Sequence, residues 1–333
     1  MAEAVARIAL DAVGGDHAPS VVVEGAVAAA REYGVEAILV GPREVVQQEL
    51  AKHDCSGLKI PVVHAEEVVG MEEHAATAIR QKRRSSIALG VSLVREGQAD
   101  AFVSAGNSGA VMASALFGLG RIEGIERPAI GTVYPTATGK CFIIDAGANV
   151  DCKPEYLAQF ALMGSAYMER VFGIAHPKVA LLSNGEEETK GNSLVQSCQP
   201  LLKASSLNFV GSVEGKDIPS GAADVVVCDG FAGNIVIKLS EGLASTLFDI
   251  LKTELTAGFA SKLAALALKP AFRRVKRRLD YAEYGGAPLL GVNGITIIAH
   301  GRSNALAIKN AVRVAKQALD QKLVEAIKAG LAG

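Results

Sequence analysis

Several features are scarce in this chain of 333 residues, and each scarcity narrows the class of protein. The five cysteines are odd in number and scattered, without a Cys-x-x-Cys pair, which favours reduced thiols over a disulfide framework. The six histidines lack the spacing of metal ligands, so no metal is predicted. No uninterrupted apolar run reaches the length of a membrane span, so the protein is expected to be soluble or to sit on a membrane surface.

Charge of either sign is not in excess. The 34 basic residues balance 35 acidic ones, so nothing indicates a nucleic-acid partner. The first ten residues, MAEAVARIAL, contain an early acid and run straight into an apolar strand, unlike a signal peptide. A cytoplasmic protein is therefore predicted, and any attraction of a charged partner must be local.

What the chain does contain is a repeated pattern. Apolar, β-branched runs end in loops rich in Gly, Asn, Asp or Ser, and helix-like segments follow, as in a mainly parallel α/β sheet. No linker divides the chain, so residues 1–333 are predicted to form one α/β catalytic domain. Ligands of such sheets bind outside the carboxyl ends of the strands, where we expect the loops to gather. Helices are expected at residues 21–34, 111–120, 155–173, 193–203, 235–255 and 304–330.

Two early loops have the composition of anion-binding sites. In LDAVGGDHAP, paired glycines allow a ligand to approach the backbone, and two acids and an imidazole supply polar contacts. In SAGNSGA, backbone N–H groups at a helix start can hold an oxyanion such as phosphate. A tight turn and a plain helix cap are the alternative interpretations. The candidate residues are Asp11, Gly14, Gly15, Asp16, His17, Gly106, Asn107, Ser108 and Gly109.

Three later loops have a similar character. DGFAGN repeats the junction of strand and helix, DAGANV supplies another amide, and LLSNGEEETKGN places a lysine beside a potential helix start. A solvated lysine is the alternative interpretation of the last loop. The candidate residues here are Asn149, Lys190, Asp229, Gly230, Gly233 and Asn234.

Familiar cofactor and nucleophile motifs are missing. GLGRIEG follows a helix and is a poor dinucleotide fingerprint, and GSVEGK is too short for a Walker A loop. GNSG is not a nucleophile elbow. No cofactor is predicted, and the remaining amides, carboxylates and lysine suit a reaction in which phosphate itself is the nucleophile.

Eight motifs, in order, resemble the family of bacterial phosphate acyltransferases. They are LDAVGGDHAP, SAGNSGA, DAGANVDCKPEYLAQFALMG, LLSNGEEETKGN, VEGKDI, VVVCDGFAGNIVIKLSEG, GGAPLLGVNG and AHGRS. The resemblance runs from about Ile8 to about Ala326, with a small departure at Val13, where methionine is expected.

The resemblance implies an enzyme that makes acyl-phosphate from acyl-(acyl carrier protein) and inorganic phosphate, toward phosphatidic acid and phospholipids. It also implies a three-layer α/β/α fold, similar to phosphate acetyltransferases and isocitrate or isopropylmalate dehydrogenases, and a homodimer. A helical projection would associate peripherally with the inner face of the cell membrane. The resemblance carries catalysis over to Lys190, and Asn107, Asn234 and His17 are further catalytic candidates.

Other functions stay open at this point. A short-chain phosphate acetyl- or butyryltransferase would use coenzyme A on the same fold. A non-catalytic module would bind carrier protein or a membrane surface without consuming the thioester. A dehydrogenase is less well supported, since the required metal-binding carboxylates and arginine clamps are not found.

The segment of residues 251–279 has the one strong charge asymmetry. Apolar residues at helical spacing run from Leu251 to Leu266, and Pro270 is expected to end that helix. Six cations and no acid follow between Lys269 and Arg278. We predict a projection over residues 245–284 that binds carrier protein or anionic lipid, although a packed helix with a solvated basic face is the alternative. Its contact residues would be Leu263, Leu266, Arg273, Arg274, Lys276, Arg277 and Arg278.

Overall fold

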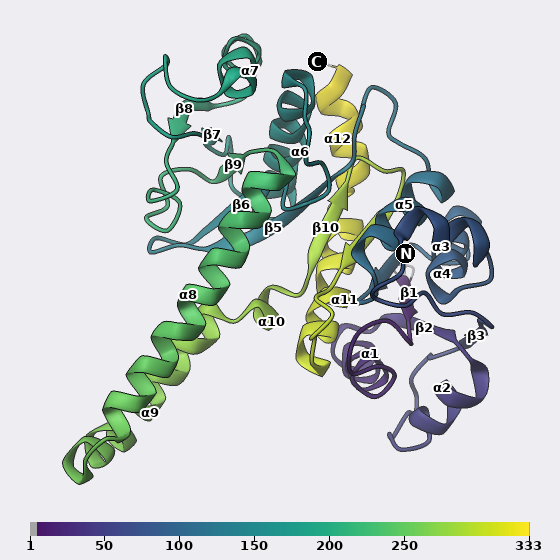
Figure 1. Cartoon of the computed structure of the whole chain (residues 1–333). Coiled ribbons are helices and arrows are strands. Elements are labelled where there is room, and N and C mark those ends of the chain that lie inside the picture. Colours follow the sequence, from purple (N-terminus) through teal and green to yellow (C-terminus); the bar gives the residue numbers. More distant parts are fainter. Residues whose placement is uncertain (1–4, 333) are drawn as a thin grey trace.

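One mixed sheet organises the protein (Figure 1). The computed structural model describes residues 5–332, except the side chains of Ala76, Phe259, Ala260, Leu263, Ala264, Lys276, Leu279 and Tyr281. Eleven strands lie in the order β3-β2-β1-β4-β11-β10-β5-β6-β9-β7-β8. Their bounds are β1 Arg7–Asp11, β2 Glu36–Gly41, β3 Val62–His64, β4 Ala101–Ser104, β5 Ala129–Pro135, β6 Lys140–Ile144, β7 Val179–Leu182, β8 Phe209–Val213, β9 Val225–Val227, β10 Ala287–Leu290 and β11 Ile295–Ile298.

Helices follow most of the strands. They are α1 Ser20–Tyr33, α2 Arg43–Leu50, α3 Ala75–Gln81, α4 Ser86–Arg95, α5 Ser108–Gly118, α6 Pro154–Phe172, α7 Ser193–Lys203, α8 Gly230–Thr256, α9 Phe259–Leu279, α10 Tyr281–Tyr284, α11 Ala305–Asp320 and α12 Leu323–Ala332. The predicted helix over residues 304–330 is two helices, because the chain turns at Lys322, whose φ of 50° is left-handed.

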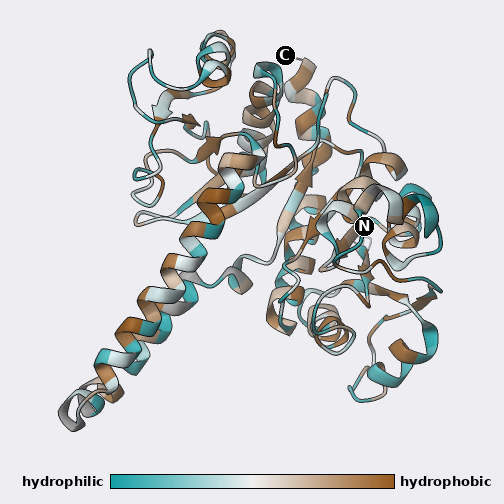
Figure 2. Ribbon diagram, viewed as in Figure 1, coloured by the Kyte–Doolittle hydropathy of each residue, from teal (hydrophilic) through white to brown (hydrophobic). Residues whose placement is uncertain are grey.

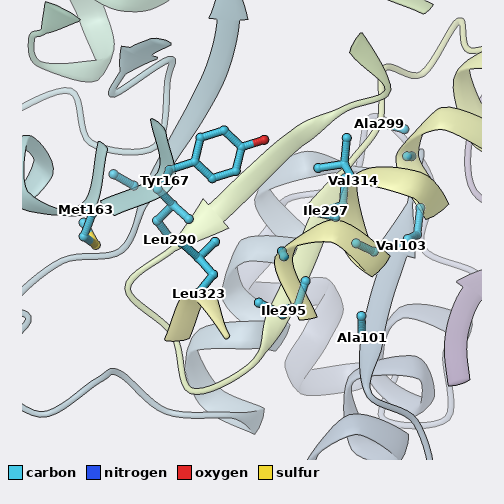
Figure 3. Close-up of a cluster of buried hydrophobic side chains, with 14 of the residues drawn as sticks. Ala101, Val103, Met163, Tyr167, Leu290, Ile295, Ile297, Ala299, Val314 and Leu323 are labelled. Carbon is cyan, nitrogen blue, oxygen red and sulfur yellow. The ribbon is translucent and has the colours of Figure 1, made fainter. Parts of the chain in front are cut away.

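The core lies on both faces of the sheet, which confirms the predicted three layers. Along β1, Ile8 and Leu10 pack on one side and Ala9 on the other, as the alternation of a strand requires. Helices α1, α6, α7, α11 and α12 cover the first face, and α3, α4 and α5 cover part of the second. Figure 3 shows Val103 of β4, Ile297 of β11 and Val314 of α11 in the first of these layers.

The two halves of the sheet run in opposite directions. Strands β1, β2, β3, β4 and β11 are mutually parallel, and so are β6, β7, β8 and β9. Antiparallel pairs of β10 with β11, β10 with β5, and β5 with β6 lie between them. The carboxyl ends of the β1 half therefore form a first edge, and those of the β6 half form a second, opposite edge. The expectation that all the polar loops gather together is wrong.

A pair of helices projects from the body. Helix α8 packs its start on the sheet through Ala232 and Val236, then extends away with α9 beside it (Figure 1). The helical conformation is interrupted between them at Ala257 and Gly258, because glycine is a poor helix former. No described helix is both long enough and apolar enough to cross a bilayer.

The prediction that Pro270 ends a helix is wrong. This proline lies inside α9, which tolerates the loss of one backbone hydrogen bond. Leu251 and Leu255 belong to α8 and Leu266 to α9, so the predicted apolar stripe does not lie on one helix. The side chain of Leu263 lies outside the described residues.

Candidate functional site

At the first edge, a buried carboxylate joins the ends of β1 and β4. Asp11 is 2% exposed and accepts a hydrogen bond of 2.8 Å from the Ser104 hydroxyl. Ser104 Oγ in turn accepts the backbone N–H of Gly106 at 3.0 Å. A β-carbon at Gly14 would lie 2.8 Å from the nitrogen of Gly106, so the approach of the two loops requires glycine there. Sequence reasoning chose Asp11, Gly14 and Gly106 and missed Ser104.

The start of α5 offers two free backbone donors at this edge. The Asn107 side chain accepts from the N–H of Ala110 and donates to the carbonyls of Gly70, Met71 and Glu73. Both ends of its amide are therefore engaged in holding the loop. Within residues 5–332, the N–H groups of Ser108 and Gly109 have no partner. They suit an anion at the positive end of the helix.

The remaining first-edge candidates surround the loop after β11. Gly15 has a φ of 103°, and a β-carbon on it would crowd Ala105 and the carbonyl of Gly301. The N–H of Asp16 donates to that same carbonyl at 2.8 Å. The side chains of Asp16 and His17 are exposed.

At the second edge, Asp145 organises the loop after β6. Its carboxylate is fully buried and accepts five N–H donors, from Ile130, Gly147, Ala148 and both nitrogens of Asn149. Sequence reasoning passed over Asp145, although it begins the quoted motif DAGANV. The signal that identifies it is an acid directly after a buried strand and before glycine and asparagine.

The loop held by Asp145 contacts the start of α8. The carbonyl of Asn149 accepts the N–H of Gly230 at 2.7 Å. Asp229 caps α8 by accepting from the N–H of Ala232 at 2.8 Å. A β-carbon at Gly233 would collide with the carbonyl oxygen of Asp145, so this contact also requires glycine.

Asn234 completes this group. A β-carbon at Gly147 would lie 3.7 Å from the Asn234 side chain, so the two residues are neighbours. Among the described residues, the Asn234 amide makes no hydrogen bond and is available as a donor. The structure thus brings together Asn149, Asp229, Gly230, Gly233 and Asn234.

Lys190 lies in the loop between β7 and α7. Because β7 pairs in parallel with β9, this loop reaches the second edge beside the start of α8. The loop is fixed by the Asn184 side chain, which accepts from the N–H of Gly191 at 2.9 Å, and by Asn192, which caps α7. In the described part of the chain, the exposed Lys190 ammonium forms no ion pair. It is an exposed cation in the loop that leads into α7.

Burial is the main cause of the pKa shifts of the acids and thiols at the two edges. It raises the pKa of Asp11 and of Asp145 above the ordinary value, while hydrogen bonds from their donors oppose the shift. Burial, assisted by the charges of Asp145 and Asp229, raises the pKa of Cys152 to about 12. Burial also raises the pKa of Cys228 well above its ordinary value. A thiol with a raised pKa is a poor nucleophile at neutral pH.

The basic segment of α9 divides into two kinds of arginine. Arg273 and Arg274 are exposed and have no partner among the described residues. Arg277 pairs with Glu283 at 3.0 Å, and Arg278 donates to the carbonyls of Thr136 and Ala137. Leu266 is exposed, and the predicted contacts Leu263 and Lys276 lie outside the described side chains.

In one chain the two edges cannot act on the same phosphate group. Asp11, His17 and the turn from Gly106 to Gly109 lie at the first edge, and Lys190 and Asn234 lie at the second. The predicted single cradle with Lys190 beside Gly106 is therefore corrected to two separate candidate anion sites.

Known structures share this fold. A phosphotransacetylase from Streptococcus pyogenes superposes with a TM-score of 0.64 at 19% identity, over 95% of this chain and 94% of its own. A branched-chain phosphotransacylase from Enterococcus faecalis gives 0.56 at 14% identity, over 94% of this chain and 99% of its own. At these identities the likeness concerns the fold alone, and it confirms the predicted fold class.

Sequence relatives are much nearer. The phosphate acyltransferase of Pelobacter propionicus is 57% identical over 93% of this chain and 90% of its own length. The phosphate acyltransferase of Pelotomaculum thermopropionicum is 53% identical over 98% of this chain and 95% of its own length. The sequence profile of the fatty acid synthesis protein family matches residues 6–326. The chain therefore belongs to the fatty acid synthesis protein family, together with these phosphate acyltransferases.

Proposed function

We propose that this protein is an acyl-(acyl carrier protein):phosphate acyltransferase whose reaction centre is the second edge. The observation that carries the location is that the loop of the unpaired Lys190 and the start of α8, where the Asn234 amide is free, follow the carboxyl ends of the adjacent parallel strands β7 and β9. Its products are acyl-phosphate and free carrier protein, which feed the synthesis of phosphatidic acid and phospholipids.

Phosphate needs little activation for this reaction, because it already carries ionised oxygens near neutral pH. One of these oxygens attacks the thioester carbonyl carbon, forming a C–O bond and a tetrahedral oxyanion. When the oxyanion collapses, the C–S bond breaks and the carrier thiolate leaves and takes up a proton. No covalent acyl-enzyme is required, which agrees with the raised pKa values of Cys152 and Cys228.

Positioning is the main task left to the protein. Orientation of two reactants contributes about 7–11 kcal/mol in favourable cases. In this proposal, Gly230 and Gly233 let the α8 turn approach Asn149 and Asp145 closely, and Asp229 caps it. Lys190 neutralises phosphate or the oxyanion, and Asn234 donates to the oxyanion. One such donor is worth about 3–4 kcal/mol.

The first edge is a second candidate anion site. His17 lies there, so within one chain it does not protonate a thiolate expelled beside Lys190. The N–H groups of Ser108 and Gly109 support binding of an oxyanion, and Asp11 and Asn107 keep them in place.

The deciding experiment mixes the protein with palmitoyl-carrier protein and phosphate and detects acyl-phosphate by mass. Turnover of acetyl-coenzyme A instead would identify a short-chain phosphate acetyltransferase. Binding of carrier protein without phosphate-dependent loss of the thioester would identify a non-catalytic module. Either result would refute the proposed reaction.

The projecting helices suggest two further contacts. Arg273 and Arg274 offer positive charge to an anionic membrane surface or to an acidic carrier protein. Along α8, apolar side chains are exposed on one face, and a second copy of the chain would cover them. We therefore propose a homodimer that associates peripherally with the inner face of the cell membrane, with residues 245–284 as the projection of a single α/β domain.

A further inference from the structure

A cationic pocket lies at the base of the projection, and none of the residues assigned to the two candidate anion sites lines it. It has a volume of about 330 Å³ and forms where α10 and α11 meet the start of β6 and the ends of α6 and α9. We call it the Lys140 pocket. Four cations line it, namely Lys140, Arg277, Arg278 and Arg313, against one carboxylate, Glu283. The lining therefore carries an excess of three positive charges.

Neighbouring acceptors fix two of the cations without neutralising them. Arg313 donates to the side chains of Asn310 and Gln317 and to the carbonyl of Glu283, over 3.0–3.3 Å. Arg278 donates to the carbonyls of Thr136 and Ala137. These acceptors are neutral, so neither guanidinium group has a carboxylate among its hydrogen-bond partners. Only Arg277 has a carboxylate partner, the side chain of Glu283.

Lys140 is held between aromatic rings. Its Nζ lies 4.5 Å from the centre of the Phe172 ring and 5.7 Å from that of Tyr284. No carboxylate within the described residues pairs with it. Burial and the nearby charge of Arg313 lower the pKa of Lys140, so the ammonium is short of a counter-charge.

Tyr167 adds a hydroxyl that lacks a partner. The residue is 1% exposed, and its ring stacks on Phe142 with centroids 4.4 Å apart. Figure 3 shows its oxygen at the end of the ring that points away from Met163 and Leu290. The residue lines the Lys140 pocket, and in residues 5–332 its hydroxyl makes no hydrogen bond. The hydroxyl is therefore free to hydrogen-bond to a ligand in the pocket.

We propose that the Lys140 pocket binds a phosphate dianion, either free or as a monoester. A phosphate monoester carries close to two negative charges near neutral pH and several acceptor oxygens, which match the cations and the Tyr167 hydroxyl. The volume is at the small end of ligand pockets, which span about 300–1,000 Å³, so it suits a small headgroup. A soluble phosphate ester and the headgroup of an anionic lipid share this chemistry.

Three probes distinguish the sources. Calorimetry on the intact protein measures the affinity for inorganic phosphate and for glycerol phosphate. Flotation measures binding to phosphatidylcholine vesicles with and without phosphatidic acid. Binding of only the vesicles that contain phosphatidic acid would identify a lipid headgroup as the ligand.

Variants assign the binding to this pocket. Lys140→Met should weaken binding of the preferred probe at least tenfold, and Tyr167→Phe, which removes only the hydroxyl, at least threefold. Lys316→Met is the matched control, because Lys316 lies on α11 outside the pocket and pairs with Asp320. Wild-type affinity for all three probes in either pocket variant would overturn the proposal.

A second control separates the pocket from the reaction centre. Binding of glycerol phosphate or of vesicles that contain phosphatidic acid should survive Lys190→Ala, and loss of that binding in the variant would overturn the pocket as the site. Inorganic phosphate is left out of this control because the proposed function also binds it beside Lys190. Formation of acyl-phosphate is measured in parallel. Failure of that reaction would refute the proposed function but would not affect the proposal that the Lys140 pocket binds a phosphate group.

Discussion

The Ser104 hydroxyl donates to Asp11 Oδ2 at 2.8 Å while it accepts the backbone N–H of Gly106 at 3.0 Å. This relay links the ends of β1 and β4 through one buried carboxylate. It also fixes the turn that presents the N–H groups of Ser108 and Gly109. The burial of Asp11 has a consequence for stability as well as for binding.

Asp11 should make stability depend on pH. Because burial raises its folded-state pKa above 3.8, the folded protein holds this proton more tightly than the unfolded chain. Its contribution is fully present below pH 3.8 and is lost as pH rises through the folded pKa, by about 1.4 kcal/mol per unit of pKa difference. Urea unfolding of wild type and Asp11→Asn between pH 4 and 7 should show a steeper decline in the wild type. Parallel curves would contradict this.

The first-edge anion site can be tested by removing one N–H group. Ser108 is the first residue of α5, a position where proline fits a helix, and Asn107 before it already has an extended ψ of 109°. Ser108→Pro should weaken equilibrium binding of phosphate at this turn at least tenfold, measured by calorimetry. Ser108→Ala keeps the N–H and should change the affinity less than threefold. Equal phosphate affinities in the two variants would exclude this turn as an anion site.

Lys190 should matter for chemistry and little for folding. The side chain is exposed and forms no ion pair with described residues, so its removal leaves no buried partner unsatisfied. Lys190→Ala should lower turnover at least tenfold, which is about 1.4 kcal/mol of transition-state stabilisation. The thermal midpoint should stay within about 2 °C, the size expected for a surface substitution. Lys203→Ala, which removes a nearby lysine paired with Glu188, is the control.

Local patterns in the sequence predicted local structure well. The helix over residues 193–203 has the predicted bounds, since Asn192 caps it and the apolar spacing is regular. The strand ends with Gly, Asn and Asp do lie at the edges of the sheet. The family and fold class followed from motifs that keep their order along the chain, and both are confirmed.

Strand direction could not be read in the same way. The reversal between the two halves depends on β5 and β10, and a strand has the same residue pattern whichever way it runs. Asp145 is different, because four of its five donors come from residues 147–149 and the acid before glycine and asparagine could have been recognised. The Lys140 pocket draws on five elements, and only the fold brings β6 and α6 together with α9, α10 and α11.

The exposed arginines of α9 should govern electrostatic docking. Each cation near an anionic leaflet is worth about 1 kcal/mol. Reversal of both Arg273 and Arg274 to Glu should therefore weaken binding to anionic vesicles, or raise the Michaelis constant for carrier protein, at least tenfold at low salt. Arg277 and Arg278 are left intact because they have internal partners. The control reverses Arg80 and Arg83, which are exposed on the body. If the two double variants have equal effects, the α9 arginines are solvent-exposed charges with no specific role in docking.

The apolar face of α8 should hold two copies of the chain together. Leu239, Leu243 and Leu247 follow one another at a spacing of four and are 68%, 66% and 55% exposed. Figure 2 shows apolar residues continuing along the projecting part of this helix. Exposed apolar surface of this extent is rare on monomers, and its burial contributes about 25 cal/mol per Å².

Light scattering should give twice the chain mass of 34.5 kDa for the wild type. Leu239→Glu combined with Leu243→Glu should give a monomer, because two carboxylates would have to be buried without partners at the interface. The fold should survive, since both side chains face solvent in the single chain. Phe117→Glu is the control, because Phe117 is 69% exposed on the body and its change should leave the dimer intact. A wild type that is monomeric, or a double variant that stays dimeric, would contradict a dimer formed through this face.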